Sequence, residues 1–213
     1  MQTNEQLIQD IARPLYQDHG PNQWPHIQRV INSAKDISAR TSQPLTNEAL
    51  AALYLHDAAK AHMEEYPGVE DHGVASSILA RKVLKGKMPQ HSIATIANAI
   101  AEHNMDVKPR SKVSDILMSA DTNLPDLDFI IRKSYMWSKR NKLNNKDLLN
   151  NVYNAAVNKS VASGRKIIPP MFAKAYPKEI DAIRGRVAAL RREDIKQLIK
   201  KALAKYRHLD QFA

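Results

Sequence analysis

The 213-residue sequence contains no cysteine, and it is poor in glycine and aromatic residues: only 6 residues are glycine and 6% are aromatic. The absence of cysteine excludes a disulfide scaffold, a thiolate-ligated zinc or iron–sulfur site, and a cysteine nucleophile. Sandwiches and barrels built from sheets usually need more glycine for their turns and more aromatic residues for cross-strand packing. The composition therefore argues against an all-β fold.

Long hydrophobic segments are also missing. No run of about 18 apolar residues occurs, so we expect no membrane span. The first five residues, Met1 to Glu5, show neither a basic region nor an apolar one, so we expect no signal peptide. With 43% apolar and 25% charged residues, the chain has ordinary globular composition. Together with the lack of cysteine, these features favour a cytoplasmic location.

Helical periodicity dominates what is present. Apolar residues recur at spacings of three and four, and no run of alternating β-branched residues stands out. Thr46 or Asn47 is suited to cap the N-terminus of one of these helices. The sequence therefore predicts an all-α fold. The predicted helices of the first part cover about residues 34–39, 50–61, 73–83, 92–103 and 111–121.

The charge is distributed unevenly along the chain. Residues 1–121 hold 12 Lys and Arg against 14 Asp and Glu, whereas residues 122–213 hold 20 against 8. From about residue 178 to 206, a long amphipathic pattern with a basic face predicts a helix. We therefore expect two parts: a helical domain over residues 1–130, and a basic helical extension over residues 131–213, packed on the same core. Such a surface attracts anions, although an ordinary solvated face would look the same.

Histidine and aspartate occur at the ends of several predicted helices. His56 and Asp57 end a strongly apolar segment, where a carboxylate is costly to bury without a partner or a metal. A polar pair at a helix C-terminus is the simpler alternative. The other helix-end residues weaken that alternative, because a helical bundle can bring such ends to one cavity. These further residues are His26, His72, His103 and Asp121.

The order of these residues resembles the signature of the HD-domain superfamily of metal-dependent phosphohydrolases. That signature is an early His, a His-Asp doublet and a later Asp, here His26, His56-Asp57 and Asp121. The first motif reads His26-Ile27-Gln28-Arg29-Val30, similar to the family's His-x-x-Arg-Val, and a Lys follows the doublet at position 60. The resemblance covers about residues 15–130 and implies an HD-type helical bundle.

Two further histidines are similar in position to those of dinuclear members. His72 and His103 fall where such members place additional ligands, and the eighteen-residue step from His103 to Asp121 is similar to that of enzymes splitting diadenosine tetraphosphate symmetrically. The long step between His72 and His103 leaves His91 as an alternative to either. The doublet is followed by Ala58-Ala59, where many members have a glycine at the second position.

The resemblance implies a role for each matched residue. One or two divalent ions (Mn, Fe, Mg, Ni, Co or Zn) would be bound, and the donor types alone do not choose among them. Asp57 and Lys60 would act in catalysis, with Lys60 and Arg29 also binding the substrate phosphate. Ordinary surface positions are the alternative for Lys60 and Arg29. The implied metal ligands are His26, His56, Asp57, His72, His103 and Asp121.

The resemblance therefore implies a metal-dependent phosphohydrolase that cleaves a phosphoester or phosphoanhydride bond of a nucleotide or nucleotide-like substrate with a metal-activated water. The basic second part supports a different hypothesis, a nucleic-acid-binding HD-like module with little or no turnover. A purely structural zinc bundle is disfavoured, because structural zinc sites commonly use thiolates.

Overall fold

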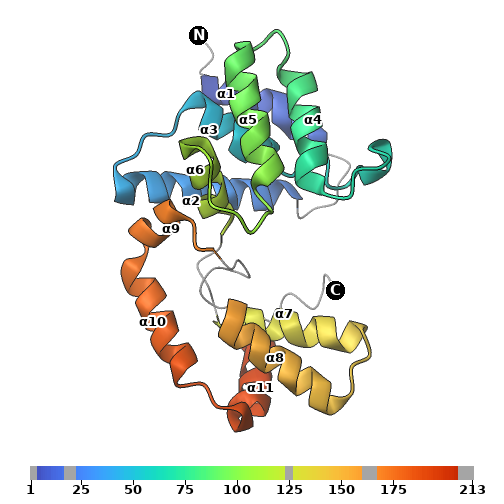
Figure 1. The fold of residues 1–213 in the computed structure, drawn as a ribbon, viewed down its shortest axis with the longest axis vertical. Helices are drawn as coiled ribbons and strands as arrows, with labels where there is room; N and C mark the ends of the chain where they lie inside the picture. The colour runs from blue at the N-terminus through green and yellow to red at the C-terminus, as the bar shows by residue number, and fades with distance from the viewer. Residues whose placement is uncertain (1–3, 17–22, 123–126, 160–166, 206–213) are drawn as a thin grey trace. The chain divides into compact units, whose positions relative to one another are not determined.

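A computed structural model describes residues 4–16, 23–122, 127–159 and 167–205. Throughout these residues the regular structure is helical, which confirms the predicted all-α fold (Figure 1). None of the described helices combines the length and the apolarity that crossing a membrane requires. The α-helices are α1 (Asn4–Ala12), α2 (Gln23–Thr41), α3 (Asn47–Leu55), α4 (His72–Leu84), α5 (Gln90–Glu102), α6 (Lys112–Asp121), α7 (Leu127–Arg140), α8 (Asn145–Lys159), α9 (Pro170–Ala175), α10 (Pro177–Ala188) and α11 (Ile195–Lys205).

The helices form two compact units. Unit 1 comprises residues 1–121 and 169–175, and unit 2 comprises residues 122–168 and 176–213. The short helix α9 therefore belongs to unit 1, although it lies far along the chain. The division into domains at about residue 130 stays a prediction, because compact units are not by themselves independently folding domains.

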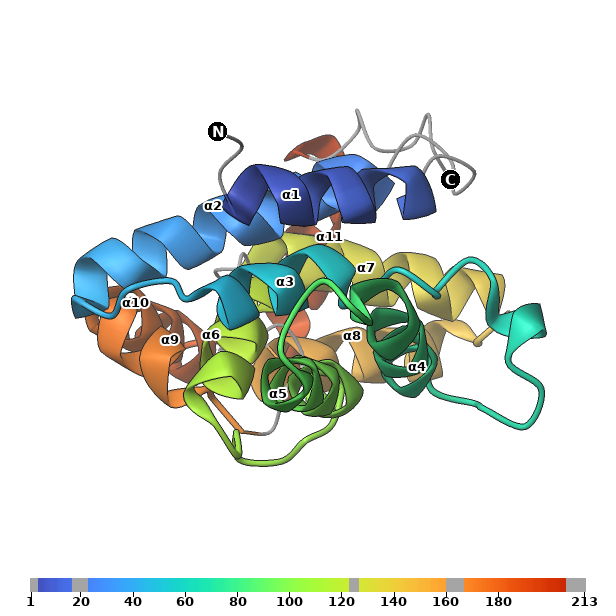
Figure 2. The same cartoon turned by 90° about the horizontal axis from the view of Figure 1, so that it is seen from above.

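Helix α3 lies at the centre of unit 1. Seven of its residues, Ala49 to Leu55, are buried, and the helix packs against α1, α2, α5 and α6. Figure 2 shows α3 between α1 on one side and α5 and α6 on the other. A helix that is apolar all round is stable only when neighbours cover it on every side. The central helix thus fixes the place where its own C-terminal end, His56-Asp57, meets the surrounding helices.

The start of α3 confirms the predicted cap. The side-chain oxygen of Thr46 accepts a hydrogen bond from the backbone N–H of Ala49 at 3.2 Å. We expect Thr46→Ala to lower the free energy of unfolding by about 1 kcal/mol, because one helical N–H loses its acceptor. Urea unfolding of the two proteins would measure this difference. Thr95→Ala is a suitable control, since the Thr95 hydroxyl donates to a carbonyl within its own helix.

The predicted helix over residues 50–61 was wrong at its C-terminal end. Helix α3 stops at Leu55, and the chain continues in tight turns in which Ala58 N–H donates to Leu55 O and Lys60 N–H donates to Asp57 O. Ala59 N–H is held by the buried hydroxyl of Ser76 on α4, at 3.1 Å. Good helix-forming residues therefore leave the helix here, because a contact from another helix satisfies the backbone.

Helix α9 is held in unit 1 by α6. The backbone N–H of Met171 donates to Asp115 Oδ1 at 3.1 Å, and that of Phe172 donates to Ser119 Oγ at 3.0 Å. The Phe172 side chain is fully buried. The free N–H groups of the first turn of α9 thus find acceptors on α6, which explains why so short a helix keeps a fixed place.

Unit 2 has its own core between α7, α8 and α11. The continuous helix predicted over residues 178–206 was wrong: α10 ends at Ala188, a short 3₁₀ turn spans Arg192–Asp194, and α11 begins at Ile195. Arg191 is extended and forms a two-pronged pair with Asp194 at 2.8 and 2.9 Å, which closes the turn. Tyr206 lies outside the described residues. The core side chains are Leu127, Ile131, Leu148, Val152, Ala156, Ile195, Ile199 and Ala202.

Candidate metal centre

Five helix ends meet in unit 1 and bring six polar side chains together. One lies in the first turn of α2, two directly follow α3, one opens α4, one directly follows α5, and one closes α6. We call this group the His/Asp cluster. Its nitrogen and oxygen atoms form three overlapping groups, each compact enough to hold a metal ion. The members are His26, His56, Asp57, His72, His103 and Asp121.

Asp57 lies at the middle of the cluster, with its two oxygens facing different histidines. Its Oδ2 atom is 3.6 Å from His26 Nε2 and 3.9 Å from His56 Nε2. Its Oδ1 atom is 3.0 Å from His72 Nε2 and 3.7 Å from His103 Nε2. A carboxylate with donors gathered at each oxygen has the arrangement needed to bridge two cations.

Asp121 completes the side of the cluster that includes Oδ2 of Asp57. Its Oδ1 atom lies 3.6 Å from His26 Nε2 and 3.9 Å from His56 Nε2. The two histidine nitrogens are themselves 3.3 Å apart. Two carboxylates and two imidazoles therefore converge at this side. Such a set of oxygen and nitrogen donors suits a divalent transition metal.

The two innermost histidines are held in the tautomer that metal binding needs. Their Nδ1 atoms donate to backbone carbonyls one turn earlier in the chain: His56 to Leu53 O at 2.9 Å, and His103 to Ile100 O at 2.6 Å. A proton on Nδ1 leaves Nε2 with a free lone pair in the neutral ring. In both histidines that Nε2 atom is the one that faces the cluster.

The Asp57 carboxylate is ionised, and the described residues do not supply a hydrogen bond to each of its oxygens. Its side chain is only 2% exposed, and Lys60 Nζ pairs with Oδ2 at 2.7 Å. Among the described residues, no donor reaches Oδ1 with hydrogen-bond geometry, although the His72 ring approaches it. A buried carboxylate oxygen without a hydrogen bond is costly unless it binds a cation. The cluster thus fits a divalent metal ion.

The close approach of α4 and α5 depends on a glycine that the sequence analysis did not assign to the site. A Cβ atom at Gly73 would lie 2.9 Å from Ile100 O and 3.1 Å from His103 Nδ1. The contact with the Ile100 carbonyl is shorter than real Cβ atoms show, so glycine is needed for this close approach. His72 and His103 can therefore face the same carboxylate. The glycine directly follows His72, and that adjacency was the available signal.

Asn104 is a second residue that the sequence analysis left without a role. Its side-chain amide nitrogen lies 2.8 Å from His72 Nε2 and 3.1 Å from His72 Nδ1. The amide thus restrains an imidazole that is otherwise more exposed than those of His56 and His103. Its position directly after His103 could have indicated a place beside the cluster.

The remaining candidates differ in how near they lie. Lys60 contacts Asp57 directly, as described above. Arg29 is exposed and reaches only the outer nitrogen of His26, with its Nη2 3.4 Å from Nδ1. His91 is exposed at the start of α5 and belongs to none of the three groups that the described residues form. The structure thus brings His72 and His103, rather than His91, to Asp57.

Burial and the neighbouring charges shift the pKa values of four members of the cluster. Loss of solvent lowers the pKa of His56 to about 4 and also lowers that of His26, despite the nearby carboxylates. Burial opposes ionisation of Asp57 and Asp121. Nevertheless, the surrounding imidazoles, together with Lys60 in the case of Asp57, hold both carboxyl pKa values below their usual range. Near neutral pH, His26 and His56 are therefore neutral and Asp57 and Asp121 are ionised, the protonation states that bind metals.

We expect the metal-free protein to lose stability as the pH falls from about 6.5 to 4. The unfolded chain protonates His56 near pH 6.5, whereas the folded chain does so only near pH 4. The unfolded state therefore binds more protons in this window, which costs roughly 2–3 kcal/mol at pH 4.5. Below this window, protonation of Asp57 and Asp121 lowers stability further. Urea unfolding in EDTA at pH 7 and 4.5 would measure the loss.

His56→Gln, which cannot titrate here, should show a shallower fall in stability over the same pH range. His91→Gln serves as the matched control, because it removes an exposed histidine from outside the cluster. Equal pH slopes for the wild type and His56→Gln would contradict the account.

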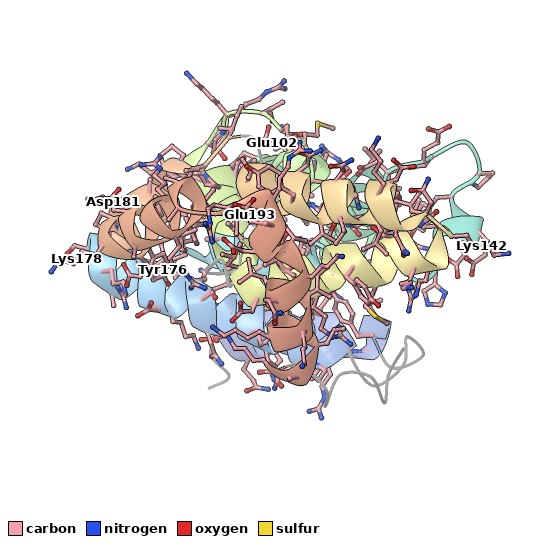
Figure 3. All side chains as sticks on the ribbon, turned by 90° about the horizontal axis from the view of Figure 1, so that it is seen from below. Glu102, Lys142, Tyr176, Lys178, Asp181 and Glu193 are labelled. Carbon is pink, nitrogen blue, oxygen red and sulfur yellow. The ribbon has the colours of Figure 1, made fainter. Side chains whose placement is uncertain are left out.

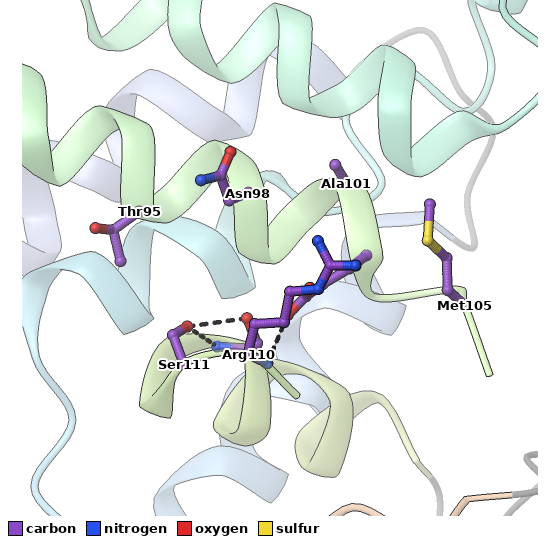
Figure 4. Close-up of a pocket in the computed structure, with 8 residues that line it drawn as sticks. Thr95, Asn98, Ala101, Met105, Arg110 and Ser111 are labelled. Carbon is purple, nitrogen blue, oxygen red and sulfur yellow. Dashed lines mark hydrogen bonds and ion pairs between the residues drawn. The ribbon is translucent and has the colours of Figure 1, made fainter. Parts of the chain in front are cut away.

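A cavity of about 450 Å³ lies between α5, α6 and the loop that joins them (Figure 4). None of its eight lining residues belongs to the His/Asp cluster. Glu102, which precedes His103, accepts a hydrogen bond from the backbone N–H of Arg110 at 3.2 Å. This contact ties the loop to the end of α5. The lining residues are Thr95, Asn98, Ala101, Glu102, Met105, Arg110, Ser111 and Ser114.

Neither a protein-family model nor a curated protein matches the sequence. Among solved structures, the chain is similar to the crystal structure of a predicted HD superfamily hydrolase from an uncultured Thermotogales bacterium. The two share 21% sequence identity over 86% of this chain and 91% of that one, with a TM-score of 0.47. At this level of likeness, the basis for assigning a function is the geometry of the cluster itself.

Proposed function

We propose that the chain is a metal-dependent phosphohydrolase of the HD type, acting on a phosphoester or phosphoanhydride bond of a nucleotide or nucleotide-like substrate. The observation that carries this proposal is the buried Asp57 carboxylate, whose two oxygens each face a separate pair of histidine Nε2 atoms. A phosphoester is protected from water by its own negative charge. An enzyme that hydrolyses it must therefore concentrate positive charge and a nucleophilic water in one place.

We assign the cluster to two ligand sets that share Asp57. His26, His56 and Asp121 would hold one ion together with Asp57, and His72 and His103 would hold a second. Bound divalent ions lower the pKa of coordinated water toward about 7 and offset the charge of phosphoryl oxygens. Asp57 would supply negative charge to both sets. The backbone carbonyls of Leu53 and Ile100 would keep the inner imidazoles in their binding tautomer.

Differences in burial indicate the side from which substrate approaches. The side chains of His56 and His103 are 1% exposed, whereas those of His26 and His72 are 23% and 26% exposed. Asp121 is 19% exposed. The phosphoryl group would therefore arrive from the side of His26, His72 and Asp121. The inner histidines form the closed back of the site, where water is excluded and charges interact more strongly.

Lys60 stands at the edge of the site. Its ammonium group touches Asp57, while its side chain is 45% exposed. We expect Lys60→Gln to raise KM about tenfold, because a point charge worth about 1.4 kcal/mol to a bound phosphate is lost. Steady-state kinetics would measure the change. Lys85→Gln removes an exposed lysine beyond the end of α4 and serves as control. An unchanged KM in Lys60→Gln would exclude Lys60 from phosphate binding.

The proposed activity can be tested with a nucleotide panel. The purified protein would be incubated with Mn²⁺ and dinucleoside polyphosphates, nucleoside triphosphates or nucleoside monophosphates, and released phosphate or nucleotide would be measured. Hydrolysis of at least one class is expected, with loss of activity in His56→Ala and little change in His91→Ala. Absence of hydrolysis with every divalent metal tried, or full activity in His56→Ala, would refute the proposal.

A further inference from the structure

Unit 2 contains a groove of about 350 Å³ between α7, α8 and α11. Its floor is apolar: Leu148 and Ile199 belong to the buried core of the unit, and Tyr135 and Leu149 pack against that core. The tyrosine is only partly buried and lines the groove. The groove thus has a recessed apolar floor that includes one aromatic side chain.

Three lysines stand around this floor, one from each helix. Lys139 comes from α7, Lys146 from α8 and Lys196 from α11, and all three are exposed. The Nζ atom of Lys139 lies 5.8 Å from the centroid of the Tyr135 ring, within the range of a cation–π contact. Asn145 is the remaining lining residue, so no carboxylate among the described residues lines the groove. We call this surface the lysine groove.

The lysines of the groove lack the compensating charge that two nearby arginines of unit 2 have. Within the described residues, none of its three lysines forms an ion pair. By contrast, Arg184 pairs with Asp181 at 3.5 Å, and Arg191 pairs with Asp194 at 2.8 Å. Figure 3 shows Asp181 on α10 and Glu193 before α11. These acidic residues pair with Arg184 and Arg191, and none of the described ion pairs involves a lysine of the groove.

Unit 2 as a whole also carries an excess of positive charge. The residues of unit 2 include 19 Lys and Arg against 8 Asp and Glu, whereas those of unit 1 include 13 against 14. The net positive charge of unit 2 would attract a long polyanion from a distance. The lysines of the groove would then contact it.

We propose that the lysine groove binds single-stranded nucleic acid. The three lysines would contact successive phosphates, and an unpaired base would lie on the floor against Tyr135. Aromatic stacking and backbone charge are the two general components of single-strand binding. This inference concerns unit 2 alone and goes beyond the function proposed for the His/Asp cluster.

The shape of the groove favours this ligand over two other polyanions. A duplex hides its bases within the helix and could use only the lysines. An anionic membrane needs apolar side chains that protrude beyond the cationic ones, whereas here the apolar atoms form the floor. A single strand can turn a base into a recess while its phosphates remain outside. Both alternatives become outcomes of the test.

The experiment measures binding of the full-length protein to a fluorescent oligothymidylate in EDTA, so that no metal-dependent reaction contributes. We expect binding at low salt, with weaker binding to a duplex of equal length. The triple variant Lys139→Gln, Lys146→Gln, Lys196→Gln should bind at least about tenfold more weakly. The slope of log K against log salt should shrink by about 2, because three phosphate contacts are lost.

A matched triple variant provides the control. Arg184→Gln, Arg186→Gln and Arg191→Gln remove the same formal charge from exposed positions of α10 and the following turn. This protein should retain most of its affinity and nearly its full salt slope. In addition, Tyr135→Leu keeps an apolar side chain on the floor but loses the aromatic ring, and should weaken binding about tenfold.

Several results would overturn the proposal. Equal weakening by the two triple variants would show that only total charge matters. Equal affinity for duplex and single strand, or no effect of Tyr135→Leu, would remove the role of the floor. Preferential binding to phosphatidylserine vesicles would indicate a membrane surface instead. Because all measurements are made without metal and read binding alone, their failure is distinguishable from failure of the proposed hydrolase activity.

Discussion

Asp57→Asn is expected to lower kcat/KM of the proposed hydrolysis by about a thousandfold or more. Asparagine has nearly the same volume, so the core around position 57 should stay packed. The substitution removes the negative charge that stands between His26 and His56 on one side and His72 and His103 on the other. Both proposed ligand sets lose their shared anion, and the transition state loses the positive charge that the ions would supply.

The matched control for this variant is Asp36→Asn. Asp36 is an exposed carboxylate on α2, the helix that also carries His26, and it pairs with Arg40 at 2.9 Å. Its loss should change activity by less than about twofold, because surface ion pairs contribute little. Circular dichroism would confirm that both variants remain helical. Activity of Asp57→Asn close to that of the wild type would contradict a central role for this carboxylate.

Adding Mn²⁺ to the metal-free protein is expected to raise its melting temperature by roughly 5–10 °C. A ligand that binds only the folded state stabilises it by about 2.7 kcal/mol at a hundred times its Kd, and each kcal/mol corresponds to roughly 2–4 °C in a chain of this size. The physical source is the buried Asp57, whose Oδ1 atom has no hydrogen bond among the described residues. A bound cation would remove that cost.

Thermal unfolding followed by circular dichroism, with and without Mn²⁺, would measure this shift. His56→Ala and Asp57→Asn should show little or none of it, whereas His91→Ala should retain the full shift. A large shift that survives in Asp57→Asn would place the metal elsewhere in the protein.

The sequence was most informative where chemistry and periodicity coincide. The apolar residues from Ala49 to Leu55 predict a buried helix, and Thr46 predicts its start. A His-Asp pair at the end of such a helix predicts that the pair lies inside the protein. The residues of the His/Asp cluster could be named because each lies at an end of a predicted helix and because their order resembles the HD-domain signature.

Other features depend on contacts between distant residues and could not be predicted locally. Helix α3 stops at Leu55 because Ser76, on another helix, holds the turn that follows. Gly73 matters only through its contact with the end of α5. The break between α10 and α11 follows from a local arginine–aspartate pair combined with the packing of Ile195 and Ile199 into the core. Periodicity alone continues the helix through that break.

The lysine groove illustrates the same limit in unit 2. The sequence shows an excess of basic residues in the second part of the chain, but it does not show which of them share a surface. Lys139, Lys146 and Lys196 are separated by up to 57 positions, and only the packing of three helices brings them around one floor. Conversely, Arg184 and Arg191 look equally basic in sequence, yet each is paired with an aspartate.

Elemental analysis of the protein after loading with Mn²⁺ and gel filtration tests the central claim most directly. If the helix ends of unit 1 bind divalent ions through Asp57, the wild type and His91→Ala should carry one to two ions per chain, and Asp57→Asn should carry almost none. Equal metal content in the wild type and Asp57→Asn, or no metal in either, would contradict the account.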